Sequence, residues 1–222
     1  MNRQDDQLQE NYDALLLGYA AGILDMAQNF IVSAHLALSP QARALVRQCE
    51  AIGGALMENE CAPVAMREAS LNAVLSKLDA PPLPEAQAKK VKLPQDVNIP
   101  EHLLECLSCR PCAPRWRRFY PGLEMCELPL ECRESGVRFI KGKRGAELPH
   151  HAHRGQEITL VLDGAYMDET GVYRRGDMVV LDETIDHATK ACDRNGIVAV
   201  VVSSEPIRLT GLLSLLNPFL RF

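Results

Sequence analysis

Four side chains that can bind a metal ion lie in the C-terminal half of the sequence, and three of them are close together. His151, His153 and Glu157 fall within seven residues, and all three have odd numbers. Because side chains alternate between the faces of a strand, we expect these three to point inward and His150 to point away. His187 follows a later apolar segment and is the natural fourth ligand. Imidazole and carboxylate donors in this number favour one divalent metal over a solvated loop.

The segments that must position these side chains have a two-residue period, which is typical of strands. From about residue 96 onward, β-branched residues come in short bursts, at 137–141, 158–162, 178–181 and 197–202. Tight turns are expected between them, at 162–164, 169–171 and 194–196. Many short strands joined by tight turns predict a β-sandwich or β-barrel.

The N-terminal third has a helical period instead. Gly22 is expected to end a first helix, and Ser39 with Pro40 has the form of an N-cap followed by a first-turn proline. Apolar residues predict helices at 13–21, 30–38, 45–56 (weakened by Gly53 and Gly54) and 71–78. Four short helices make a marginal bundle, so this module is expected to need a partner.

A stretch rich in proline and charge separates the two parts of the chain at 79–95. We therefore predict two domains joined by a linker. The first is a small all-α helical bundle at 1–80, the linker is 81–95, and the second is an all-β barrel at 96–222.

Composition and charge exclude several classes of function. The net charge is −5 with both signs spread along the 222 residues, which argues against direct nucleic-acid binding. No apolar run approaches the roughly 18 residues of a membrane span, and the polar N-terminus is not a signal peptide. We expect a cytoplasmic protein whose eight cysteines are mostly thiols.

Three other patterns have more than one interpretation. Cys106, Cys109 and Cys112 could hold zinc or an iron–sulfur cluster, or respond to oxidants, but surface thiols are favoured because no second ligand pair follows. Trp116, flanked by Arg115 and Arg117 and followed by Arg118, could bind RNA, although strand alternation favours Trp116 in a core. The segment 212–216 is interpreted as an edge element or dimer contact.

The candidate ligands also carry a resemblance to the cupins. The spacing from His151 through His153 and Glu157 to Gly164 resembles the first cupin motif, and Gly176 with His187 resembles the second, although Leu181 replaces a common proline. Six further segments resemble the ChrR family of anti-sigma factors, at 13–22, 35–39, 53–57, 62–65, 115–117 and 153–164. A helical module followed by a cupin is more specific than either part alone.

This resemblance implies a fold, a partner and a signal. Homodimerisation is an expectation from the marginal helical module and the segment 212–216, not from the resemblance. The resemblance implies a jelly-roll cupin barrel after a helical domain that binds an extracytoplasmic-function sigma factor. It also implies a response to singlet oxygen or related oxidants through the cupin. Its metal is expected to be zinc in preference to iron, manganese or nickel, held by His151, His153, Glu157 and His187.

The sequence departs from the family in the helical domain. The positions where zinc-binding members carry two histidines and two cysteines fall on Glu10, His35, Ser39 and Ala42. Only His35 keeps a ligand of the family's type, so we expect no N-terminal zinc and interpret His35 as a packing or surface histidine. The alternative function is a cupin-type metal-dependent dioxygenase acting on a small organic substrate. The preceding helical domain favours the regulator.

Overall fold

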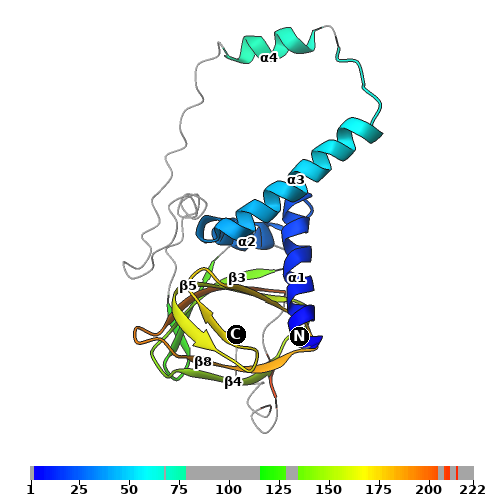
Figure 1. Cartoon of the computed structure of the whole chain (residues 1–222). Coiled ribbons are helices and arrows are strands. Elements are labelled where there is room, and N and C mark those ends of the chain that lie inside the picture. The colour runs from blue at the N-terminus through cyan, green and yellow to red at the C-terminus, as the bar shows by residue number, and fades with distance from the viewer. Residues whose placement is uncertain are drawn as a thin grey trace.

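The structure is a computed structural model, and it has helices followed by strands. It describes residues 3–67, 69–78, 116–128, 135–204, 208–210 and 214. The described helices all precede residue 79 and the described strands all follow residue 116, in the order predicted (Figure 1). The linker predicted at 81–95, Cys106, Cys109 and Cys112 lie outside the described residues, as does nearly all of 212–216.

The helices are α1 (Arg3–Ala20), α2 (Met26–Leu38), α3 (Pro40–Glu60) and α4 (Ser70–Leu78). The Ser39 side chain accepts the Ala42 N–H at 3.2 Å and Pro40 follows it, so the predicted N-cap of α3 is confirmed. Two boundaries were predicted wrongly. α1 begins ten residues before Asp13, with side-chain hydrogen bonds one turn apart supporting its polar part, and α3 ends at Glu60, beyond the predicted end at residue 56.

The strands form a curled antiparallel sheet that makes a half-barrel. Their pairing order is β1-β2-β3-β9-β5-β8-β4-β10, and β6 and β7 also pair with β5. Four of them contain the predicted bursts, namely β3, β5, β7 and β9. The bounds are β1 (Arg117–Tyr120), β2 (Leu123–Leu128), β3 (Gly136–Gly142), β4 (Glu147–Ala152), β5 (Glu157–Met167), β6 (Val172–Arg174), β7 (Met178–Leu181), β8 (Asp186–Ala191), β9 (Ile197–Ser203) and β10 (Arg208–Leu209).

The turn predicted at 162–164 is wrong, because β5 runs through it. A register shift between Val161 and Asp163 lets the long strand bend toward β8 instead of ending. Gly164 has a φ of 72°, and a Cβ added there would lie 2.0 Å from the Gly196 carbonyl oxygen. The glycine therefore allows two backbones to approach within the sheet, where the sequence suggested a reversal of the chain.

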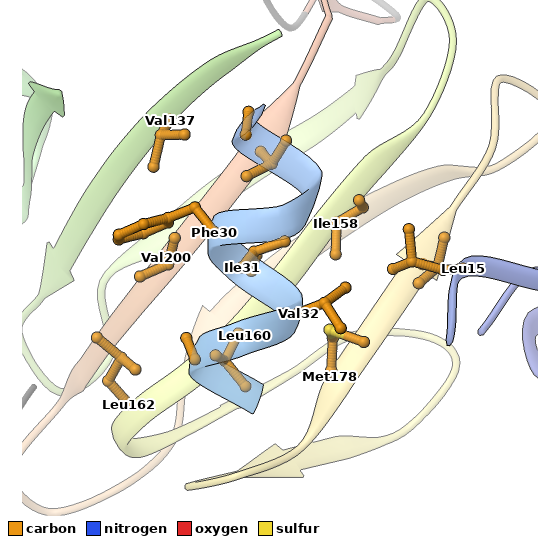
Figure 2. Packing of buried hydrophobic residues seen from close by; sticks show 14 of the residues in the cluster. Leu15, Phe30, Ile31, Val32, Val137, Ile158, Leu160, Leu162, Met178 and Val200 are labelled. Atoms are coloured by element: carbon orange, nitrogen blue, oxygen red, sulfur yellow. The ribbon is translucent and has the colours of Figure 1, made fainter. Parts of the chain in front are cut away.

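The outer face of the sheet is covered by the helices. In Figure 2, Phe30, Ile31 and Val32 of α2 pack over the strands that carry Val137, Leu160 and Val200, among others. Residues of α1, α2, α3 and the sheet belong to one buried cluster, so the first three helices share a core with the barrel. Trp116 packs against this cluster while Arg117 and Arg118 are exposed, which confirms the core interpretation of the tryptophan.

α4 lies apart from the barrel and from the other helices (Figure 1), and none of its residues is buried. Within the part of the chain that the structure describes, no helix has both the length and the apolar character needed to cross a membrane.

Candidate metal centre

The four predicted ligands come together inside the barrel. One ligand atom from each of His151, His153, Glu157 and His187 lies within 4.8 Å of the others, and each residue is only 2% to 6% exposed. The reason given for their convergence was partly wrong. β4 ends at Ala152, so only His151 lies on a strand before the turn, His153 lies in the turn, and Glu157 begins β5.

Backbone geometry brings the chain around the site. Gly155, with a φ of 82°, lies in the short turn that carries the chain from β4 into β5. His187 is on β8, later than the strand end where the sequence placed it, and it pairs in register with His151 on β4. His150 points outward with its side chain 58% exposed and lies 3.3 Å from carboxylate oxygens of both Glu169 and Asp186. It is therefore outside the site, as alternation predicts.

In His151 and His187, the ring is oriented so that Nε2 faces the centre. His151 Nδ1 is hydrogen-bonded to the Pro149 carbonyl oxygen at 2.8 Å, which leaves its Nε2 free to bind a metal. The Nε2 atoms of His153 and His187 lie 3.2 Å apart. His153 Nδ1 is buried and has no hydrogen-bond partner. It lies 3.2 Å from Glu157 Oε2, but the two atoms are not aligned for a hydrogen bond. A buried polar atom without a partner and converging imidazole nitrogens fit a metal ion.

Asp168 orients His187 from behind. Its Oδ2 accepts from His187 Nδ1 at 3.1 Å, and its Oδ1 accepts the Thr170 backbone N–H at 2.8 Å and hydroxyl at 2.5 Å. The Asp168 side chain is fully buried. A carboxylate behind a histidine fixes the ring and makes its other nitrogen a better ligand. Sequence analysis missed Asp168, because its only signal was its position beside a predicted turn.

Burial decides the protonation of two candidate ligands, His151 and His153. It lowers the pKa of His151 and of His153 to about 4, so both rings are neutral near pH 7, the form that binds metals. Burial would also lower the pKa of His187, but the hydrogen bond to Asp168 and the negative charge of Glu157 outweigh it and raise that pKa. The same hydrogen bonds from His187 and Thr170 outweigh burial at Asp168 and lower its pKa.

The family's N-terminal zinc positions are used differently in this chain. His35 is buried, and its Nε2 lies 2.8 Å from the Tyr12 hydroxyl. The Ser39 side chain caps α3, Ala42 is in the core, and Glu10 is exposed. Within the described ranges, the set in the barrel is the one group of three or more histidine, cysteine or acidic side chains arranged to hold a metal.

Comparison with known proteins identifies the family. A family model described as the ChrR cupin-like domain matches residues 107–206. The anti-sigma-E factor ChrR of Cereibacter sphaeroides is 36% identical over 210 residues, covering 94% of this chain and 96% of the relative. This chain belongs to the ChrR family of anti-sigma factors. A crystal structure of Rhodobacter sphaeroides SigE in complex with the anti-sigma ChrR aligns with a TM-score of 0.68 at 35% identity, covering 86% of this chain and 96% of the ChrR chain.

Membership in the ChrR family confirms the resemblance that the sequence indicated. It also confirms the fold class, because the relative aligns over both the helical and the cupin parts of the chain. The dioxygenase alternative gains no support from these matches.

Proposed function

We propose that this ChrR-family chain binds an extracytoplasmic-function sigma factor through its helices and holds one divalent metal in its cupin barrel. Support for the partner comes from the relative that was crystallised in complex with SigE and aligns over most of this chain. The observation that carries the proposal for the chain itself is the exposed apolar face of α4.

α4 has an apolar stripe that nothing in the described chain covers. Leu71, Val74, Leu75 and Leu78 follow the i, i+3, i+4, i+7 pattern of one helix face, and all four are exposed. A nine-residue helix is marginal alone in water, so its apolar face needs something to bury it. A helical groove on a partner protein would supply that surface.

The second half of α3 extends this surface. Ile52, Leu56 and Met57 are exposed there, whereas the first half of the helix buries Ala42 and Val46 against the other helices. The first half of α3 therefore packs on the other helices, and its second half, with α4, remains for a partner. Removal of apolar side chains from water is the main favourable contribution to such association.

Co-purification tests the partner. We would co-express the full chain with each extracytoplasmic-function sigma factor of its host and measure complex formation. The Leu75→Asp substitution places a charge on the apolar stripe and is expected to reduce recovery of the complex at least tenfold. Ser76→Asp adds the same charge to the next residue of α4 and is the matched control. Equal recovery with both variants would contradict the proposal.

The metal is proposed to be zinc, bound by His151, His153, Glu157 and His187. Three imidazoles and a carboxylate are a suitable zinc set, and a zinc centre would supply cross-linking between β4, β5 and β8 without redox chemistry of its own. The proposed response to singlet oxygen and related oxidants would begin at these side chains. Glu157 faces the centre, while its neighbour Ile158 packs under α2, so a displaced carboxylate would disturb the helical interface.

Metal analysis tests the centre. We expect about one zinc per purified chain and its loss in His187→Ala, because a ligand from β8 is removed. His150→Ala is the control, since this adjacent histidine is exposed and points away from the site. A zinc content that is unchanged in His187→Ala would exclude the proposed ligand set.

A further inference from the structure

The barrel interior holds a cavity next to the candidate metal centre. Its volume is about 90 Å³, and His151, Glu157 and His187 form part of its wall. Most of the remaining wall is apolar, with Leu123, Met125, Ile140 and Ala199 among the lining residues. Neither the metal ligands nor the helical interface requires this space, because the helices pack on the opposite face of the sheet.

One cationic side chain enters this apolar cavity. On β3, Val137 and Phe139 face the helices, whereas Arg138 and Ile140 line the cavity. The Arg138 side chain is only 14% exposed. Its Nη1 donates to the Ser203 hydroxyl at 2.6 Å, but its buried Nε has no hydrogen-bond partner and lies 3.6 Å from the half-exposed Glu127 carboxylate.

Arg138 lies at the same end of the barrel as the metal ligands. Ser203, which holds the guanidinium, is the direct β9 partner of Glu157 on β5. A buried guanidinium N–H without an acceptor costs free energy, and an anion bound beside it would remove that cost. The candidate metal ligands lie at this end too, so a bound metal would favour the same anion.

We propose that the barrel binds a small carboxylate with a short apolar tail. The carboxylate contacts Arg138 and the metal, and the tail fills the space between Leu123, Met125 and Ile140. Because an apolar cavity of about 150 Å³ accepts benzene, this smaller cavity fits a tail of about three to five carbons. The inference rests on the metal centre of the proposed function and is independent of the sigma factor.

Calorimetry with simple probes tests this inference. The full chain is loaded with zinc and titrated with butyrate and, separately, with butyramide, which has the same shape without the charge. Butyrate is expected to bind at least tenfold more tightly than butyramide, and more tightly to the zinc-loaded than to the metal-free chain. Equal binding of the two probes, or binding of neither, would overturn the inference without requiring any variant.

Two arginine variants test whether the positive charge of Arg138 binds the carboxylate. Arg138→Gln is expected to weaken butyrate binding at least tenfold. Arg118→Gln is the control and should leave binding unchanged, because Arg118 is exposed on β1, two strands away from β3. Unchanged affinity in Arg138→Gln would also overturn the inference. Zinc content is measured in the same samples. A chain that binds zinc but does not discriminate butyrate refutes this inference alone, whereas a chain that binds no zinc refutes the metal centre as well.

Discussion

Asp168 is not one of the four candidate ligands, but its hydrogen bond fixes the orientation of the His187 ring. Its carboxylate holds His187 Nδ1 at 3.1 Å and is itself held by the backbone and hydroxyl of Thr170. These bonds leave Nε2 as the only nitrogen of His187 that faces the centre. The ring orientation therefore depends on a residue outside the four ligands.

Replacing Asp168 by Asn is expected to lower zinc affinity about 10- to 100-fold, because the amide is a weaker acceptor and carries no charge. Competition with a chromophoric chelator measures the affinity. Glu169→Gln is the control, since Glu169 is a half-exposed neighbour whose side chain contacts His150 and the Ala188 backbone N–H. If both variants bound zinc equally well, Asp168 would have no role in positioning His187.

Gly164 is the residue whose loss should damage the barrel most by backbone effects alone. Gly164→Ala is expected to cost at least about 3 kcal/mol of unfolding free energy, from a positive φ and a Cβ placed 2.0 Å from the Gly196 oxygen. Gly145→Ala shares the positive φ but meets nothing within 4 Å, so about 1 kcal/mol is expected. Urea unfolding measures both, and equal losses would exclude the close approach as the cause.

At the residue scale, sequence reasoning found the four candidate ligands because their residue types are rare and their spacing is dense. His151, His153, Glu157 and His187 do gather, although two strands and a turn bring the first three together where one strand was expected. Asp168 and Arg138 were not found. Acidic and basic side chains are common on surfaces, and only the fold shows that these two are buried beside the centre.

At the scale of elements, α2 packs on β5 and β9 and so holds the helices against the sheet. Ile31→Ala is expected to destabilise the protein by about 2–5 kcal/mol, because Ile31 is fully buried in the cluster between helices and sheet. Ile52→Ala, at an exposed position on α3, should stay within about 0.5 kcal/mol. Urea unfolding followed by circular dichroism measures the difference. An unaffected Ile31→Ala variant would mean that α2 does not pack on the sheet in solution.

His35 of α2 makes the stability of the interface between the helices and the sheet depend on pH. Burial lowers its pKa, and the smaller opposing influences of the Gly176 backbone and Asp177 do not reverse the shift. A histidine with a lowered folded-state pKa stabilises the protein above its unfolded pKa, about 6.5, and loses that contribution as the pH falls. The stability advantage of the wild type over His35→Gln should therefore shrink from about pH 7.5 to about pH 5.5. Urea midpoints measure this advantage, and one that stayed constant would show that His35 is not buried in its neutral form.

Most elements could be predicted from the sequence, but their ends could not. The two-residue period located β3, β5, β7 and β9, and the apolar rhythm located the helices. α1 was predicted too short because its first half is polar and forms a helix with little burial of its own. β5 was expected to end near Asp163 and Gly164 because a turn and a bulge use the same residues, and only the pairing with β9 separates the two.

At the scale of the whole molecule, the helices have two apolar surfaces. One is buried against the barrel, and the other, on α4, is exposed. The predicted helical bundle does not stand alone, because α1 and α2 pack on the outer face of the barrel and α3 packs on these two helices within the same buried cluster. The sequence could not show this, since a helix face that packs on a sheet has the same period as one that packs on helices. α4 lies apart from the other helices (Figure 1), and its apolar stripe is exposed, which suits a helical module that binds a partner.

Transcription reconstituted from RNA polymerase and the cognate sigma factor tests the central claim most directly. An equimolar amount of the full chain is expected to suppress sigma-dependent transcripts at least tenfold, and Ser76→Asp should suppress them equally. Leu75→Asp should leave most transcription intact, because its charge lies on the stripe that the sigma factor would cover. Full transcription in the presence of the wild-type chain, or equal suppression by Leu75→Asp, would contradict the anti-sigma mechanism proposed for this protein.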